Sequence, residues 1–329
     1  MKAFSNVNAR DMKDAASQLQ AASKKGQSAV IVGGGSDALG MVKERLITPD
    51  VLVSLKSIRG LDRVTEKGGE VVIGGLITLD ALSRDPLIRK NYNVLAEAAG
   101  HVGTPQIRNA GTLAGNVCQR PWCWYYRNGF PCFKNGGSTC FSVTGENEFH
   151  AIFGGGPSYI VHPSDTAVAL MALDATLRIV GPSAPREAVA SEFFTLPRPD
   201  ATRENTLAND ELVASIVLPA PKPGTRSTYH KIMDREAWTH AVVSAAVVLE
   251  MDGNICQRAH VVLGGVAPIP WRLPEVEKLL SGQRITPELA AQAGELAIVG
   301  ARPLEKNKYK LPLTKNLVKR TVIELAQRT

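Results

Sequence analysis

Four of the five cysteines in this 329-residue chain fall within 23 residues, inside a long segment without a regular pattern. The segment runs from Gly111 to Gly156 and is rich in glycine and aromatic residues. Loops of this length are uncommon unless they are functional or cross-linked. The N-terminal residues contain no apolar signal segment, so we expect reduced thiols rather than disulfides. Clustered thiols then favour ligation of a metal or an iron–sulfur cluster.

The spacing of these cysteines indicates which metal or cluster they could bind. Cys118, Cys123, Cys132 and Cys140 follow the pattern C-x4-C-x8-C-x7-C. Structural zinc sites usually pair two ligands two to four residues apart, and only the first gap approaches that. Iron–sulfur clusters accept wider spacing. Spacing alone leaves an iron–sulfur cluster, a zinc ion and unliganded thiols open. Cys256, on an expected strand, is interpreted as a buried small hydrophobe.

The remainder of the chain shows ordinary α+β patterning, and its length predicts two or three domains. A buried strand over Gln27–Val32 ends in Gly33-Gly34-Gly35, and residues 37–46 are helix-like. Further strands are expected at 51–55, 70–75, 241–251 and 255–263. Helices are expected at 79–83, 93–100, 276–280, 287–298 and 313–327, a helix followed by a strand within 166–180, and a connector at 182–210.

Charge and hydropathy exclude several classes of protein. The longest nearly unbroken apolar run, Ala241 to Leu249, is too short to span a bilayer, which needs about 20 residues. Of the net charge of +7, +6 lies in residues 301–329, where Tyr309 is the only aromatic residue. Nucleic-acid binding is therefore not expected. The basic stretch is either a solvated helix face or a docking surface for an acidic partner. We expect a cytoplasmic chain, or a periplasmic one exported with a partner subunit.

Two glycine-rich stretches suit a phosphate ligand. The first, GGGSD after the strand ending at Val32, leaves backbone N–H groups open to a phosphate oxygen. It also matches G-x-G-x-x-A, but the acidic residue that a Rossmann site needs about 20 positions later is missing. A simple glycine turn is the alternative. The second stretch, Arg108 to Asn116, adds Thr and Asn side chains, and two such loops could clamp one diphosphate.

Six segments in order resemble a known family: IVGGGSDAL, IGGLITLDAL, GTPQIRNAGTLAGNV, HPSDTAVAL, YHKIMDREAW and LGGVAPIPWR. They are similar to the FAD-binding medium subunits of molybdenum hydroxylases, the xanthine dehydrogenase and carbon monoxide dehydrogenase group. The resemblance implies an α+β fold with a two-part FAD-binding domain of the vanillyl-alcohol-oxidase/CO-dehydrogenase flavoprotein type. That domain would cover residues 1–222, with subdomains 1–56 and 57–222 and a Cys-rich insertion at about 117–157. A smaller α/β domain with an antiparallel sheet and helices would cover 223–329.

The same resemblance implies FAD as cofactor and a set of residues that bind it. The first loop would supply main-chain donors to the pyrophosphate, and Lys231 would reach the flavin ring, where a cation stabilises its reduced, anionic form. The implied FAD residues are Val32, Gly33, Gly34, Gly35, Ser36, Asp37, Thr104, Gln106, Ile107, Arg108, Thr112, Ala114, Gly115, Asn116, Asp165 and Lys231.

Within this family, the cysteine-rich insertion most resembles that of aldehyde oxidoreductases and 4-hydroxybenzoyl-CoA reductase. The resemblance implies a [4Fe–4S] cluster held by Cys118, Cys123, Cys132 and Cys140. The fourth cysteine of the relatives usually lies where this chain has Ser158, so either Cys118 completes the set or Ser158 or solvent does.

The function implied is that of the FAD-carrying electron-transfer subunit of a three-subunit oxidoreductase. An aldehyde, a purine or an aromatic compound would be oxidised on a molybdopterin-binding large subunit. Electrons would pass through a [2Fe–2S] small subunit to FAD and then to an external acceptor. The residues alone leave two other interpretations open. One is a free-standing flavin- or nicotinamide-dependent oxidoreductase with a zinc-stapled loop, and the other is a non-enzymatic cofactor-binding protein.

Overall fold

The N-terminal part of the chain forms a small parallel sheet backed by one long helix. The computed structural model describes residues 2–237 and 239–328. Helix α1 (Met12–Lys24) begins at Asp11, whose carboxylate accepts the N–H of Asp14. Its buried face recurs at i, i+3 and i+4 and packs on the sheet. The sheet has the order β1 (Ser5–Asn8), β3 (Val51–Ser54) and β2 (Ala29–Val32), and the short α2 (Ala38–Lys43) follows β2.

An antiparallel sheet forms the second layer. Its strands lie in the order β4 (Val64–Lys67), β5 (Glu70–Gly74), β8 (Leu212–Leu218), β6 (Thr176–Val180) and β7 (Arg186–Val189). Helices flank it: α3 (Leu79–Arg84), α4 (Pro86–Asn91), α5 (Asn93–Gly100), α6 (Pro105–Ala110), α7 (Leu113–Val117), α9 (Asp165–Ala172) and α10 (Ala190–Phe193). Every residue of α9 is buried, because this helix packs against strands of the third sheet as well.

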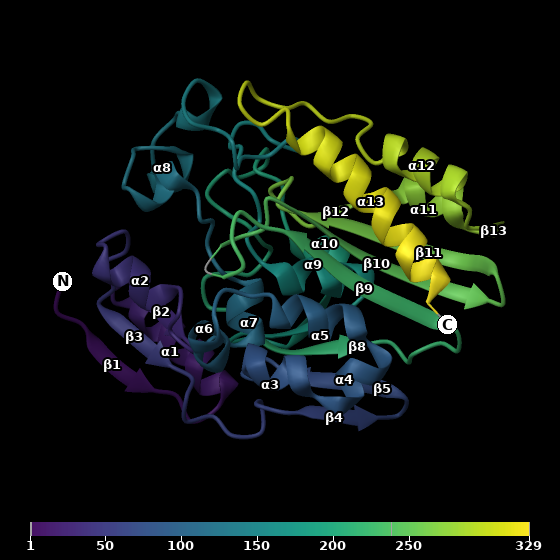
Figure 1. The fold of residues 1–329 in the computed structure, drawn as a ribbon. Coiled ribbons are helices and arrows are strands. Elements are labelled where there is room, and N and C mark those ends of the chain that lie inside the picture. Colours follow the sequence, from purple (N-terminus) through teal and green to yellow (C-terminus); the bar gives the residue numbers. More distant parts are fainter. Residues whose placement is uncertain (1, 238, 329) are drawn as a thin grey trace.

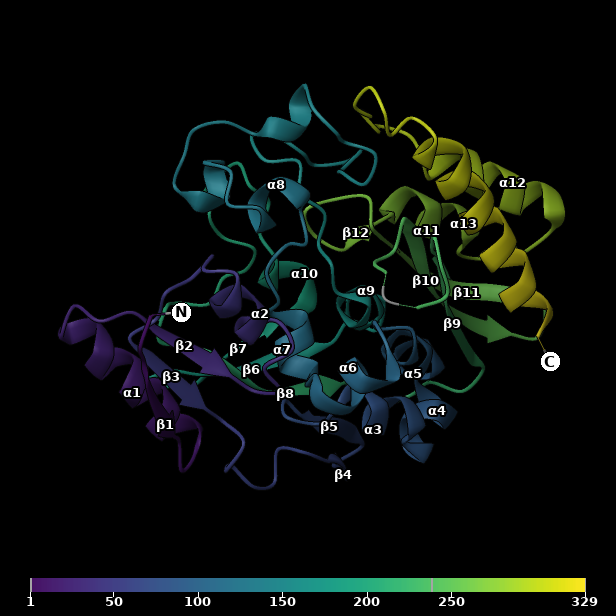
Figure 2. The same cartoon turned by 60° about the vertical axis from the view of Figure 1, so that its left-hand side comes forward.

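The C-terminal part is a second antiparallel sheet covered by helices. Strands β9 (Thr225–Ile232), β10 (Val243–Asp252), β11 (Ile255–Gly264) and β12 (Trp271–Arg272) lie side by side, and β13 (Gln283–Arg284) pairs with β11. Figures 1 and 2 show α11 (Pro274–Leu280), α12 (Pro287–Leu296) and α13 (Lys310–Gln327) over one face of this sheet. Helices α5 and α9 contact its strands from the central part of the molecule.

This arrangement confirms the expected α+β architecture, with one correction. The segment 182–210, expected to be a connector, contains β7 and α10. Strand β7 was missed because its four residues alternate between exposed and half-buried positions at a sheet edge, so it lacks an apolar run. No helix among the described residues has both the length and the apolar character that a bilayer crossing needs.

The cysteine-rich segment links the first sheet to the C-terminal domain. After α7, which ends at Val117, its helical elements are α8 (Trp124–Arg127) and the 3₁₀ turns Phe133–Asn135 and Phe141–Val143. Asp37, in the first glycine-rich loop, accepts the backbone N–H of Arg120 at 3.0 Å. At the other end the Oδ1 atom of Asn147 accepts the backbone N–H of Lys306 at 2.9 Å. The segment is therefore anchored on both sides.

The basic C-terminal stretch is partly neutralised within the chain. Lys306 pairs with Glu146, Lys315 with Glu295 and Arg320 with Glu324. Lys310 is fully buried. These contacts weaken the expectation that the stretch acts as a docking surface, because paired charges contribute little to long-range attraction.

Candidate functional site

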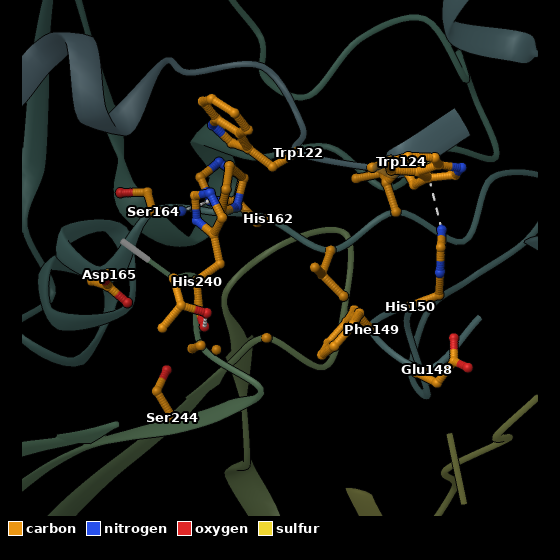
Figure 3. Close-up of a pocket in the computed structure, with 18 of the residues that line it drawn as sticks. Trp122, Trp124, Glu148, Phe149, His150, His162, Ser164, Asp165, His240 and Ser244 are labelled. Atoms are coloured by element: carbon orange, nitrogen blue, oxygen red, sulfur yellow. Dashed lines mark hydrogen bonds between the residues drawn. The ribbon is translucent and has the colours of Figure 1, made fainter. Parts of the chain in front are cut away.

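Three cavities meet end to end between the glycine-rich loops and the C-terminal domain. The loop cavity, about 500 Å³, lies against the first glycine-rich loop and α7. The middle cavity, about 220 Å³, shares Ser36, Thr112 and Gly115 with it. The outer cavity, about 570 Å³ and shown in Figure 3, shares Trp122, Asp165, His240 and two neighbouring residues with the middle one. Together they form an elongated hollow suited to a long ligand.

The first glycine-rich loop presents unused backbone donors to this hollow. Within the described part of the chain, no acceptor takes a hydrogen bond from the backbone N–H groups of residues 33–37. Gly35 has φ +79°, a conformation that L side chains rarely adopt. A Cβ atom on Gly34 would overlap the carbonyl oxygen of Ala110, so this glycine lets the two glycine-rich loops touch. Such a run of open N–H groups is an anion-binding surface.

In the second glycine-rich loop, the N–H groups of residues 113–116 already donate within the chain. The N–H groups of Leu113 and Ala114 donate to the carbonyl oxygens of Ile77 and Gly75 at 3.0 and 2.9 Å. Those of Gly115 and Asn116 donate to the Oγ1 and carbonyl oxygen of Thr112, which caps α7. The two loops are thus not equivalent: the first offers donors, and the second offers a small-residue surface beside it.

A buried ion pair joins the two domains at the far end of the middle cavity. Lys231, on β9, donates from Nζ to Oδ2 of Asp165 at 2.7 Å, and Asp165 is the first residue of α9. Tyr229 donates its hydroxyl to Oδ1 of the same carboxylate at 2.5 Å. Burial, followed by the charge of Asp165, raises the pKa of Tyr229 well above its usual value, so this phenol stays protonated. Asp165 lines both the middle and the outer cavity.

Comparisons with known proteins bear on what this hollow holds. A family model described as "FAD binding domain in molybdopterin dehydrogenase" matches residues 2–221. A second, "CO dehydrogenase flavoprotein C-terminal domain", matches residues 228–325. The chain belongs to the FAD-binding subunits of the molybdenum hydroxylase family.

Relatives of this family match over nearly the whole chain. The aldehyde oxidoreductase FAD-binding subunit PaoB of Escherichia coli (strain K12) is 32% identical over 98% of both chains. The carbon monoxide dehydrogenase medium chain of Hydrogenophaga pseudoflava is 26% identical over 90% of this chain and 89% of its own. A structure of the Cu,Mo-CO dehydrogenase matches with a TM-score of 0.79 at 24% identity and full coverage of both chains, which shows the shared fold. This molybdenum hydroxylase chain is accordingly an FAD-binding oxidoreductase subunit.

The residues of the hollow fit the FAD that the family binds. An adenine dinucleotide is long and carries a diphosphate. The residues with unused N–H groups, 33–37, line the loop cavity, and Ser36 and Asp37 also line the middle cavity. Eleven of the expected FAD residues line at least one cavity: Gly33, Gly34, Gly35, Ser36, Asp37, Ile107, Thr112, Ala114, Gly115, Asn116 and Asp165.

The other five expected FAD residues are not among those that line the three cavities. Val32 ends β2, Thr104 caps α6, and Lys231 is held by Asp165. Gln106 lies on α6, and Arg108 donates to the carbonyl oxygen of Val102. Asn116 lines the middle cavity, but its side-chain oxygen accepts hydrogen bonds from the hydroxyls of Ser164 and Thr166 at 2.6 Å each.

The four expected cluster ligands are not in one place. The thiols of Cys132 and Cys140 are close enough to Cys123 to influence its pKa, which burial raises to about 11. Cys118 ends α7 and lines the loop cavity, and burial raises its pKa to about 12. The described residues include no group of three or more His, Cys, Asp or Glu side chains that could hold a metal ion. Ser158 is buried, and its neighbour Tyr159 donates its backbone N–H to Cys140.

Several lining residues were not predicted as part of an FAD site. Arg120, Tyr126 and Lys134, from the Cys-rich segment, face the loop cavity, and Lys134 pairs with the buried carboxylate of Glu204. His240 borders the middle and outer cavities and lies 5.3 Å from the ring of Trp122. No local motif marks these positions, because they lie on irregular loops or on single helical turns within such loops.

Proposed function

We propose that the joined cavities hold one FAD, with its diphosphate at the first glycine-rich loop. The observation that supports this most is the run of unused N–H groups at residues 33–37, which line the loop cavity and, at Ser36 and Asp37, the middle cavity as well. Val32, Thr104, Gln106, Arg108 and Lys231, which do not line the cavities, would then act on the FAD site through the residues that do. FAD, when bound, supplies reversible uptake of two electrons.

A buried ion pair between Lys231 and Asp165 lies where the middle and outer cavities adjoin. The Nζ atom of Lys231 lies beside Asp165 with almost no exposure to solvent, and Asp165 borders two cavities. A preorganised cation–carboxylate pair stabilises charge that develops nearby at little reorganisation cost. We infer that Lys231 acts through Asp165, as a positioning residue for the flavin end.

We further propose that the chain works in a complex with a molybdopterin-binding large subunit and a [2Fe–2S] small subunit. Electrons from substrate oxidation on the large subunit would reach FAD here and leave to an external acceptor. Relatives carry names such as aldehyde oxidoreductase and carbon monoxide dehydrogenase. These names support the proposal that a small molecule is oxidised on a partner subunit. The complex would be cytoplasmic, or periplasmic if a partner carries the export signal.

The domain boundary is proposed near residue 222, between β8 and β9.

We propose that the Cys-rich segment binds a [4Fe–4S] cluster through Cys123, Cys132 and Cys140. Cys132 and Cys140 each contribute to the raised pKa of the Cys123 thiol, after burial, which supports this set. The wide spacing of the three cysteines along the chain also suits a [4Fe–4S] cube. Cys118 is the fourth ligand that we proposed from sequence, and Ser158 is its competitor. Iron analysis and the paramagnetic signal of the reduced chain test this in Cys118→Ser and Ser158→Ala. Loss of one iron or an altered signal only in Cys118→Ser supports Cys118, and four irons with an unchanged signal in that variant refute it.

The FAD site is tested by blocking it from an exposed position. Ser36 lines the loop and middle cavities and is exposed, so a larger side chain there meets no packed interior. Ser36→Phe should lower the FAD content at least tenfold while the thermal unfolding temperature of the apoprotein stays within a few degrees. Ser23→Phe, an equal change on the exposed side of α1, should keep full occupancy. Equal FAD content in both variants contradicts the proposed site.

A further inference from the structure

The Cys-rich segment forms one wall of the loop cavity. Arg120, Tyr126, Lys134 and Asn135 line this cavity together with the first glycine-rich loop. Tyr126, on α8, donates its hydroxyl to the sulfur of Met41, on α2, at 3.7 Å. In Figures 1 and 2 helix α8 lies above α2. The shape of the loop cavity therefore depends on how firmly this irregular segment is held down.

Two cations of this wall share one buried acid. Among the described residues that line the loop cavity, the basic ones are Arg120 and Lys134. The Nη1 atom of Arg120 lies 3.0 Å from Oε2 of Glu204, and the Nζ atom of Lys134 lies 2.5 Å from Oε1. The side chains of Glu204 and Lys134 are only 5% and 2% exposed. One carboxylate thus fastens the Cys-rich segment at two points.

The shared acid is anchored on the core of the FAD-binding domain. The backbone N–H of Thr195 donates to the carbonyl oxygen of Glu204 at 3.0 Å, and Asn205 forms an isolated β-bridge with Phe194. Phe194 is buried in the hydrophobic core of this domain. Glu204 itself is not among the residues that line the three cavities. It can therefore act on a ligand of the loop cavity only through the residues that it holds.

Loss of this acid would release the wall. A buried cation without an anion is costly, because the protein interior does not replace the water that the cation has lost. Lys134 is far more buried than Arg120, so its ammonium gains most by moving out to solvent. Lys134 lies on the short 3₁₀ turn Phe133–Asn135, within an otherwise irregular stretch. This part of the Cys-rich segment would move with the side chain, and the loop cavity would open.

We propose that Glu204 is a positioning residue for FAD, which holds the Cys-rich segment closed over the loop cavity through Arg120 and Lys134. The inference rests on the proposed function, which places the FAD diphosphate in this cavity. Closure and FAD binding then favour each other, and by reciprocity FAD stabilises the closed segment as much as closure stabilises FAD. Charge alone predicts the opposite effect of Glu204, because an acid near an anionic diphosphate weakens its binding.

The affinity for FAD tests the proposal first. FAD is added to the full chain after its flavin has been removed, and quenching of flavin fluorescence gives the Kd. Glu204→Gln should raise this Kd at least tenfold. Glu187→Gln removes an exposed acid that pairs with Arg178 outside the cavities, and it should leave the Kd unchanged. The double variant Glu204→Gln with Lys134→Met leaves no buried lysine unpaired, so part of the lost affinity should return.

Amide hydrogen exchange separates this role from a general loss of stability. In the FAD-free chain, Glu204→Gln should speed up exchange across residues 119–137 and leave that of strand β10 unchanged. A purely structural role would speed up exchange in β10 as well. In the native chain, added FAD should slow exchange across residues 119–137. This last measurement needs no variant, so it tests the linkage even if Glu204→Gln does not fold.

Four results would overturn the inference. They are an unchanged or lower Kd in Glu204→Gln, no recovery in the double variant, equally faster exchange in β10, and no protection of residues 119–137 by FAD. The native chain separates these failures from failure of the proposed function. A native chain that binds no FAD refutes the proposed function itself, whereas a native chain that binds FAD and gives any of the four results refutes only the role of Glu204.

Discussion

The Nζ atom of Lys231 lies 2.7 Å from the Oδ2 atom of Asp165, and neither side chain is more than 6% exposed. Lys231 also donates to the carbonyl oxygen of His101 at 3.0 Å. The pair joins β9 of the C-terminal domain to the first turn of α9. The two residues are 66 positions apart in sequence, and the fold places them together at the end of the middle cavity.

This pair should be strongly coupled in stability. Lys231→Met leaves a buried carboxylate without its cation, and Asp165→Asn leaves a buried ammonium without its anion. Removing one partner of such a pair costs about 3–5 kcal/mol. The double variant should lose clearly less than the sum of the two single losses. Urea unfolding of all four proteins measures this, and additive losses would show that the pair does not interact.

The contact between the two glycine-rich loops should not tolerate a methyl group. Gly34→Ala places a Cβ atom on the carbonyl oxygen of Ala110, so the loops must separate. We expect a loss of about 1–3 kcal/mol in stability and a drop in FAD content. Gly40→Ala is the matched control, because its Cβ meets nothing within 4 Å and it lies in α2. Gly40→Ala should be neutral or stabilising by about 0.5–1 kcal/mol. Similar behaviour of the two variants in thermal unfolding would refute the close approach.

Arg127 should hold the Cys-rich segment against the first glycine-rich loop. Its Nη2 atom donates to Oδ1 of Asp37 at 2.7 Å, and its Nε atom donates to the carbonyl oxygen of Pro121 at 2.8 Å. Arg127→Lys keeps the charge but loses this fork of donors. We expect faster proteolytic cleavage within 117–157 and weaker FAD binding. Arg84→Lys, at an exposed position, should change neither. An unchanged cleavage rate in Arg127→Lys would show that the segment is held elsewhere.

Lys310 should make stability depend on pH. Burial lowers the pKa of its amine from 10.5 to about 7, while the amine donates to the carbonyl oxygens of His150 and Gly265. Between these two pKa values the folded chain binds fewer protons than the unfolded chain, so stability rises with pH across that window. Below about pH 7 the cost of burying the charged amine is fully present.

The variant Lys310→Met lacks this titration. From pH 7 to pH 10 the native chain should therefore gain stability relative to Lys310→Met, by up to about 1.4 kcal/mol per pH unit. Guanidinium unfolding at pH 7, 8.5 and 10 measures the difference. Lys308→Met, at an exposed position, should show a constant difference from the native chain. A constant difference for Lys310→Met as well would contradict a neutral buried amine.

The sequence predicted those features that depend on local patterns. Strand β2 with its glycine loop, helix α5 and the β10–β11 hairpin lie within two residues of expectation, because each has a continuous apolar pattern or a turn signal. Edge strand β7 lacks such a pattern. The pairing of Asp165 with Lys231 could not be read from spacing, since it depends on the docking of two domains.

The same limit applies to the site. The donors of the first glycine-rich loop were predicted from its residue types. In the second loop, the backbone N–H groups of Leu113 and Ala114 donate to the carbonyl oxygens of Ile77 and Gly75, and only the folded structure shows these bonds. The sequence also predicted a main-chain donor at Asp37, but it did not predict that the Asp37 carboxylate contacts Arg120 and Arg127 of the Cys-rich segment. Contacts made across irregular loops have no periodicity that a sequence pattern could reveal.

The nucleotide released from the purified full chain tests the central claim most directly. The chain is denatured, and the supernatant is separated by liquid chromatography and identified by mass. An elongated hollow with diphosphate donors at residues 33–37 predicts one FAD per chain. Release of FMN, of a nicotinamide dinucleotide in place of FAD, or of no nucleotide from a chain supplied with FAD would contradict the account.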